Sequence, residues 1–162
     1  SENVMKYAVV LARRLNVPDS EIENIKYAGL LHDIGKIGVS ETILNKPGRL
    51  TDVEFDEIKK HPLIGARIIS DVPLLKQLVP LVLHHHEYFN GNGYPDGIAG
   101  EEIPYGARIL AVADTYEAMT SDRPYRKALS VEQARKILTE EKGRQFDADV
   151  ADCFLSIIPE HG

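Results

Sequence analysis

Apolar residues recur every three to four positions along nearly all of the 162-residue chain, which is the spacing of one face of an α-helix. The first segment shows this spacing at Val4, Ala8, Leu11 and Leu15. No segment shows the strict alternation typical of a half-buried strand. With 43% hydrophobic residues, the chain is suited to one sizeable core. The sequence therefore predicts a single all-α domain, a bundle of about six to eight helices.

Short polar motifs predict where several helices begin. A Ser or Thr followed three residues later by Glu or Gln forms a capping box, in which each side chain accepts a hydrogen bond from the other residue's backbone N–H. The pairs are Ser20 with Glu23, Thr51 with Glu54, and Ser130 with Gln133. Asp147 is the predicted start of the last helix. The segment from Leu74 to His85 is predicted as one helix. Pro80 must either kink this helix or lie in its first turn.

Residues 87–106 interrupt the helical pattern. This stretch contains five glycines, at positions 91, 93, 97, 100 and 106, together with Pro95 and Pro104. Long irregular loops inside compact domains are usually either functional or disordered. The sequence therefore predicts a long Gly/Pro-rich loop of one of these kinds, followed directly by a helix from about Ala107 to Met119.

Charge and cysteine content narrow the classes of partner. A net charge of −6 argues against a long nucleic acid, whose binding depends on many phosphate contacts, but leaves a small phosphate ligand open. The sequence has no run of about 18 apolar residues that could span a membrane. Cys153 is the single cysteine, which excludes an intramolecular disulfide and fits a reducing cytoplasm. We expect a cytoplasmic domain without membrane contact of its own, in a parent protein that is either soluble or membrane-anchored.

Five of the six histidines stand where metal ligands are plausible. They are His32, which directly precedes Asp33, then His61, and the internal run His84, His85 and His86. The run cannot face one centre with all three rings, because successive helical side chains diverge by about 100°. Each group also has an ordinary interpretation: a histidine favoured by a helix C-terminus, a solvated aspartate, or a surface histidine.

Asp114 lies in a segment that is otherwise apolar. The apolar residues around it cover most of the helix circumference, so its carboxylate is expected to be at least partly buried. An unpaired buried charge is costly, and the carboxylate therefore requires a cation. A metal ion would serve; the alternatives are a buried Arg or Lys partner, or an exposed helix face. Nitrogen and carboxylate ligands in this mixture suit zinc, iron or manganese.

A second group of residues is basic. Lys36 follows Asp33 by three positions, and Arg123 and Arg126 follow the helix that carries Asp114. Arginine offers a planar fork suited to phosphate, and lysine a point charge, although solvated surface charges are the ordinary alternative. Beside a metal centre these residues favour a phosphate clamp. Two metals about 3.5–4 Å apart can hold a bridging hydroxide for the hydrolysis of a phosphoester.

Longer motifs resemble a known family. His32-Asp33 with the later Asp114 resembles the HD superfamily of metal-dependent phosphohydrolases. The loop Gly91-Asn92-Gly93-Tyr94-Pro95, which follows His85-His86-Glu87, resembles the HD-GYP subfamily. Further matching segments spread the resemblance over essentially the whole chain.

This resemblance implies an HD-domain helical bundle with cyclic di-GMP phosphodiesterase activity in bacterial signal transduction. Members open cyclic di-GMP to pGpG, many continue to GMP, and some accept the hybrid cyclic GMP-AMP. The implied cofactors are two or three divalent ions, iron or manganese. The implied metal ligands are His32, Asp33, His61, His85, His86 and Asp114. Asp33, as the bridging carboxylate, and Lys36 would be catalytic, and the residues in contact with substrate would be Lys36, Tyr94, Arg123 and Arg126.

One family position is missing from the chain. A further ligand histidine, about a helix and a half before His32, would fall just before Ser1. We therefore expect residues 1–162 to be an N-terminally truncated domain from a larger protein with an upstream regulatory domain. Two alternatives stay open. One is a catalytically impaired module that binds cyclic di-GMP or a signalling partner such as a diguanylate cyclase domain; the other is an HD phosphohydrolase that acts on another nucleotide.

Overall fold

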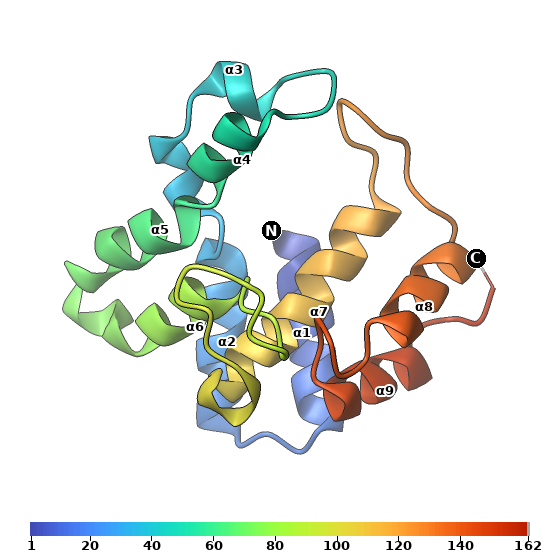
Figure 1. Ribbon diagram of the computed structural model, residues 1–162. Helices are drawn as coiled ribbons and strands as arrows, with labels where there is room; N and C mark the ends of the chain where they lie inside the picture. The colour runs from blue at the N-terminus through green and yellow to red at the C-terminus, as the bar shows by residue number, and fades with distance from the viewer. Residues whose placement is uncertain (162) are drawn as a thin grey trace.

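The computed structural model describes residues 1–161 as helices joined by turns and one long loop (Figure 1). The α-helices are α1 (Glu2–Arg14), α2 (Asp19–Leu31), α3 (Glu41–Leu44), α4 (Asp52–Ile58), α5 (His61–Ser70), α6 (Val79–His84), α7 (Tyr105–Thr120), α8 (Val131–Glu140) and α9 (Ala148–Ile157). The 3-10 helices are η1 (Ile34–Gly38), η2 (Pro73–Leu78) and η3 (Gly100–Glu102). These residues contain no β-strand, only two isolated bridges. The predicted all-α bundle is confirmed.

Helix α7 is the central element of the bundle. Its buried residues are Gly106, Ala107, Ile109, Leu110, Val112, Ala113, Tyr116 and Met119. A helix that is apolar on nearly all sides is stable only when other elements surround it. Helices α1, α2, α6, α8 and α9 pack around it. Asp114, in the middle of α7, is thereby placed in the interior of the molecule, as its apolar neighbours predicted.

Three aromatic rings join the two ends of the chain to α7. Tyr7 of α1 and Tyr116 of α7 meet edge to face with ring centroids 5.2 Å apart. Phe154 of α9 lies 5.0 Å from Tyr116 and 6.0 Å from Tyr7, again edge to face. Such pairs contribute beyond their buried area. They fix α1 and α9 against the helix that carries Asp114.

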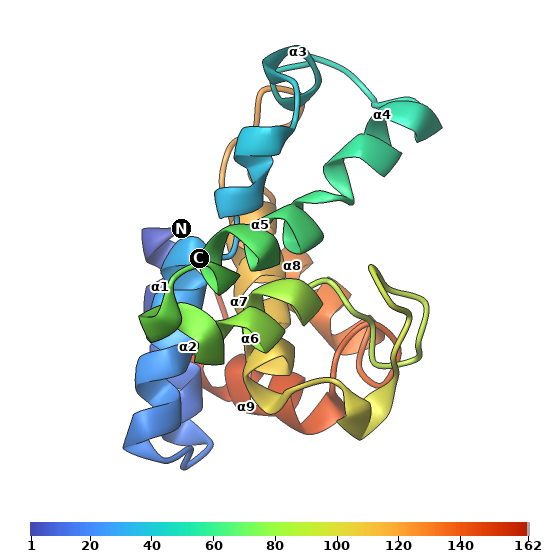
Figure 2. The same cartoon turned by 90° about the vertical axis from the view of Figure 1, so that its left-hand side faces the viewer.

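Helices α3 and α4 lie outside the main bundle. Figure 2 shows them rising above α1, α2 and α7, reached through η1 and α5. Neither α3 nor α4 has a buried residue, whereas η1 and α5 pack closely against each other. The loop between α3 and α4 faces the segment after α7, residues 121–130 (Figure 1).

Most of the predicted helix starts are confirmed. Thr51 and Ser130 each form a complete capping box, and the Asp147 side chain caps α9. The Ser20 capping box is wrong, because α2 begins at Asp19 after Pro18. The carbonyl oxygen of Pro18 already accepts the first helical hydrogen bonds, so Ser20 lies inside the first turn.

The segment from Leu74 to His85 is divided in two. Its first half forms the 3-10 helix η2, and Pro80 lies in the first turn of α6. Proline is tolerated there because the first backbone N–H groups of a helix have no intrahelical acceptor. Along residues 1–161, none of the helices has both the length and the apolar character needed to cross a bilayer.

Candidate metal centre

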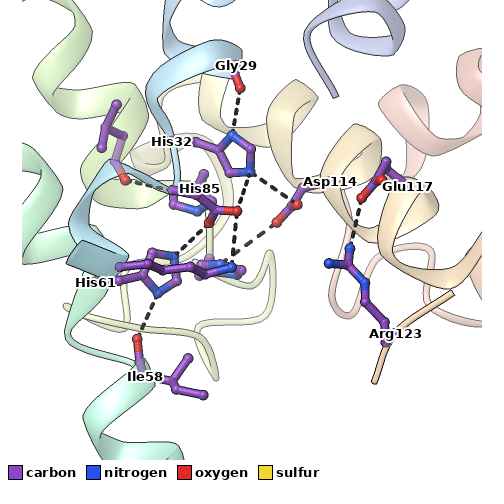
Figure 3. A network of polar contacts seen from close by, with 12 residues as sticks. Gly29, His32, Ile58, His61, His85, Asp114, Glu117 and Arg123 are labelled. Carbon is purple, nitrogen blue, oxygen red and sulfur yellow. Dashed lines mark hydrogen bonds and ion pairs between the residues drawn. The ribbon is translucent and has the colours of Figure 1, made fainter. Parts of the chain in front are cut away.

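The six predicted ligand positions come together from separate parts of the chain. His32 follows α2, Asp33 precedes η1, His61 opens α5, His85 and His86 follow α6, and Asp114 lies on α7. Figure 3 shows His32, His61, His85 and Asp114 directed toward one space. The histidines and Asp33 lie at the ends of helices, and Asp114 lies in the middle of α7, so the packing of the bundle assembles the cluster.

A repeated hydrogen bond orients three of the imidazole rings. In each ring Nδ1 lies 2.7 Å from a backbone carbonyl oxygen three residues earlier: Gly29 for His32, Ile58 for His61 and Val82 for His85. A carbonyl oxygen only accepts, so Nδ1 carries the proton that is donated. In the neutral ring Nε2 then keeps its lone pair. This is the orientation in which proteins present histidine to a metal ion.

The three Nε2 atoms are buried and have no hydrogen-bond partner within residues 1–161. A buried polar atom without a partner is costly, and such atoms are rare in native proteins. One ring nitrogen from each of His61, His85 and His86 lies within 4.8 Å of the other two, close enough for one ion. The donor set of imidazole and carboxylate therefore fits a divalent metal ion, which would satisfy the buried nitrogens.

Each carboxylate of the cluster spans two histidines. Asp33 places Oδ2 3.4 Å from Nε2 of His32 and Oδ1 3.4 Å from Nε2 of His61. Asp114 places Oδ1 3.3 Å from Nε2 of His32 and Oδ2 3.8 Å from Nε2 of His86. The two oxygens of one carboxylate thus face different rings, which is the arrangement needed to link two neighbouring ions.

The pKa values of the cluster suit metal binding. Burial alone would raise the pKa of Asp114, but contact with His32 and the charges of the nearby imidazoles lower it far below its usual range. Burial lowers the pKa of His86 to about 4 and that of His85 well below the ordinary value. For His32 the effect of burial is outweighed by Asp114 and Asp33, which raise its pKa. Near neutral pH the cluster therefore contains ionised carboxylates and neutral rings at His85 and His86, the ligand forms that bind metal.

Two of the predicted substrate-binding cations line the same cavity. Lys36 places Nζ 3.0 Å from Oδ2 of Asp33. Arg123 donates from Nη2 to Glu117 at 2.8 Å (Figure 3). Both residues border the cavity in front of the cluster, and this cavity has a volume of about 270 Å³. Glu117 was not singled out in the sequence, although it lies one helical turn after Asp114.

Arg126 is not brought to the centre. Its guanidinium donates to the backbone carbonyls of Ala118 at 2.8 Å, Lys127 at 3.0 Å and Met119 at 3.4 Å. The last carbonyls of a helix have no intrahelical donor, and a cation is favourable at that end. Arg126 therefore caps α7 and borders a second cavity farther out.

The long loop places Tyr94 over the cluster. The Tyr94 ring stacks on that of His86, with centroids 5.0 Å apart and an interplanar angle of 19°. The Tyr94 N–H donates to the His86 carbonyl at 3.2 Å, and the Tyr94–Pro95 peptide bond is cis. Burial raises the pKa of Tyr94, so its hydroxyl stays neutral and is able to donate. The loop is thus part of the site.

Glu87 secures this loop and received no role from the sequence. Its side chain is buried and accepts from the backbone N–H groups of Asp96 at 2.7 Å and Gly97 at 3.0 Å. His84 approaches the same carboxylate at 3.5 Å, so its ring belongs to the loop clamp and not to the metal cluster. These hydrogen bonds join Glu87 at the start of the loop to Asp96 and Gly97, and so hold the intervening segment, which contains Tyr94, in place.

We expect Glu87→Ala to lower the free energy of unfolding by about 2–3 kcal/mol, because it leaves two amide donors without their charged acceptor. Glu87→Gln keeps one acceptor oxygen and should lose less. Glu101→Ala, an exposed position in the same loop, is the matched control. Urea denaturation followed by circular dichroism measures the difference; equal stability of Glu87→Ala and Glu101→Ala would contradict the clamp.

Comparison with known proteins shows which family the chain is similar to. A sequence profile of the HD domain family matches residues 1–150. The cyclic di-GMP phosphodiesterase PA4108 of Pseudomonas aeruginosa is 46% identical over 151 residues, which is 93% of this chain and 36% of that protein. The cyclic di-GMP phosphodiesterase response regulator RpfG of Xanthomonas campestris is 39% identical over 95% of this chain and 41% of its own length. The chain thus spans about two fifths or less of these relatives.

The fold has a counterpart among solved structures. Bd1817, described as an HDG"Y"P protein from Bdellovibrio bacteriovorus, superimposes with a TM-score of 0.78. The match covers 96% of this chain and 50% of that chain, at 20% sequence identity. At this identity the likeness concerns the fold.

Proposed function

Because the chain belongs to the HD domain family, we propose that it is a metal-dependent phosphodiesterase domain that hydrolyses cyclic di-GMP to pGpG or further to GMP. One observation carries the proposal: His32, His61 and His85 each have a buried Nε2 atom without a hydrogen-bond partner, and the carboxylates of Asp33 and Asp114 lie 3.3–3.4 Å from the first two of these atoms. The names of the two curated relatives support the choice of substrate.

The proposed centre binds two divalent ions. One set of ligands is His61, His85 and His86, whose nitrogens lie within 4.8 Å of one another. The other is His32 with Asp114, and Asp33 faces both sets. The mixed nitrogen and oxygen donors suit zinc, iron or manganese, and the resemblance to HD-GYP proteins favours iron or manganese. When bound, such ions supply Lewis acidity at the phosphate and lower the pKa of water.

The side chains of the cavity bind and orient the diester. Lys36 and Arg123 direct positive charge toward the space beside Asp33 and offset charge on the non-bridging phosphate oxygens. Tyr94, fixed on His86, limits the side from which substrate enters. In the reaction one water oxygen bonds to phosphorus, the bond from phosphorus to the 3′ oxygen breaks, and that oxygen takes up a proton, which leaves a linear 5′-phosphorylated dinucleotide.

A second candidate is binding of cyclic di-GMP without turnover. One observation favours it: Lys36, Tyr94 and Arg123 line the cavity and can hold a phosphodiester without a bound ion. Metal content and product formation, measured on the same sample, separate the candidates.

The test of the proposed function combines metal analysis with product analysis. Protein purified without oxygen should contain about two iron or manganese ions per chain and convert cyclic di-GMP to pGpG or GMP. Treatment with a chelator should abolish turnover, and adding Mn²⁺ should restore it. Binding of cyclic di-GMP without any product in the metal-loaded protein would overturn the enzymatic assignment in favour of the second candidate.

A further inference from the structure

A groove leads from the metal cluster to an open cavity between two loops. The outer cavity has a volume of about 500 Å³ and is bordered by Arg49, Leu50, Asp52, Phe55, Tyr125 and Arg126. A middle cavity of about 250 Å³ shares residues with both neighbours. It shares Lys36 and Arg123 with the cavity of the metal cluster, and Leu50 and Phe55 with the outer cavity, while Tyr125 borders all three. The three cavities are therefore neighbours in a row that begins at the metal cluster.

The walls of the outer cavity present flat apolar surfaces. Phe55 is 44% exposed and Tyr125 58% exposed, although large aromatic side chains are usually mostly buried. Phe55 comes from α4 and Tyr125 from the segment after α7, so two segments far apart in the sequence border the same cavity. Arg126 adds a guanidinium plane held in place by three carbonyls. Aromatic faces and guanidinium planes are the surfaces on which proteins stack nucleobases.

Asp52 adds an acceptor at the edge of this cavity. It lies in the first turn of α4 and is exposed, and its carboxylate makes no hydrogen bond or ion pair with another residue of 1–161. Guanine presents two adjacent donors on its Watson–Crick edge, the N1–H and the 2-amino group, which one carboxylate can accept together. Adenine presents an acceptor at N1 in the same place. A carboxylate here therefore favours guanine over adenine.

We propose that the outer cavity is the subsite for one guanine base of the substrate, stacked between Phe55 and Tyr125 and hydrogen-bonded by Asp52. This inference rests on the proposed function, since it places the scissile phosphate at the metal cluster. Lys36 and Arg123 border the groove between the two places, where the sugar-phosphate backbone of a cyclic dinucleotide would run. The base is then recognised by residues that do not touch the reacting atoms.

The experiment measures binding separately from turnover. The affinity for cyclic di-GMP is determined by calorimetry on protein without added metal, for the wild type, Phe55→Ala, Asp52→Asn and Val53→Ala. Val53 is the matched control, because it lies on α4, is exposed and borders none of these cavities. We expect Phe55→Ala to weaken binding about tenfold, equal to about 1.4 kcal/mol, and Val53→Ala to bind as the wild type does.

Base recognition is tested further with two other ligands. Asp52→Asn should lose most of the preference for cyclic di-GMP over cyclic di-AMP. Hydrolysis of bis(p-nitrophenyl) phosphate, a diester without a nucleobase, should be the same in metal-loaded Val53→Ala and wild type. In Phe55→Ala the KM for cyclic di-GMP should rise. Because Phe55 also meets the Tyr94 ring at 6.4 Å, a fall in kcat with an unchanged KM would show a general disturbance of the site and would overturn the subsite.

The outcomes separate this proposal from the proposed function. If the wild type hydrolyses cyclic di-GMP while Phe55→Ala keeps wild-type affinity and KM, the subsite is overturned and the enzyme assignment stands. If the wild type binds cyclic di-GMP with the expected dependence on Phe55 but yields no product with metal, the subsite stands and the enzyme assignment fails. Absence of cyclic di-GMP binding by the wild type overturns the subsite.

Discussion

Asp33→Ala is expected to reduce hydrolysis of cyclic di-GMP by at least about a hundredfold, the scale of losing one electrostatic group at a reacting phosphate. Asp33 places one carboxylate oxygen 3.4 Å from Nε2 of His32 and the other 3.4 Å from Nε2 of His61, and so lies between the two ligand sets. It also accepts from Lys36, which it holds in the cavity. Removing it separates the two ligand sets and releases the lysine, so metal content and kcat should fall together.

The control for this prediction is Asp71→Ala. Asp71 caps α5 with its backbone, is exposed, and borders none of the cavities described above. Asp33→Asn keeps the shape of the side chain but removes its charge and one anionic oxygen, so it should retain part of the metal and little of the turnover. Elemental analysis measures the metal content, and product chromatography on the same samples measures the turnover of cyclic di-GMP. Wild-type turnover in Asp33→Ala would show that the cluster is not the reaction centre.

The parts of the fold that depend on local patterns could be predicted from the sequence. Apolar spacing indicated the helices, and the apolar surroundings of Asp114 indicated that its carboxylate lies inside. Thr51 and Ser130 were predicted as helix starts because a capping box needs only four consecutive residues. Ser20 met the same rule and failed, because the preceding proline already supplies the carbonyl at which the helix begins.

The parts of the site that depend on distant contacts could not be predicted in this way. The residues alone favoured Asp114 and the His84–His86 run but left an ordinary alternative open for each ligand, and the full set came from resemblance to HD-GYP proteins. Arg126 has the residue type and position of a phosphate ligand, yet the open carbonyls at the end of α7 take its guanidinium. Glu87 becomes a clamp only when the loop returns nine and ten residues later. The placement of Phe55 and Tyr125 at one cavity has no local signal in the sequence, because these residues come from segments far apart in the chain.

Gly35→Ala is expected to cost about 3 kcal/mol or more in the free energy of unfolding, at the upper end of the range for overpacking. A Cβ on Gly35 would overlap the carbonyl oxygen of His61 and lie 2.5 Å from the backbone nitrogen of Gly65. Both obstacles are backbone atoms of α5, so no side-chain rotation relieves them. The helix must move away from η1, and His61, its first residue, moves with it.

The same displacement should weaken metal binding, because His61 contributes both to the ring cluster and to the contact with Asp33. Gly48→Ala is the matched control: a Cβ there meets nothing within 4 Å, so its stability and metal content should equal those of the wild type. Thermal unfolding with and without Mn²⁺ distinguishes the two effects. A ligand that binds only the folded state stabilises that state, so Mn²⁺ should raise the stability of the wild type and of Gly48→Ala. The gain in Gly35→Ala should be much smaller. A full metal-dependent gain in Gly35→Ala would mean that contact between η1 and α5 does not set the position of His61.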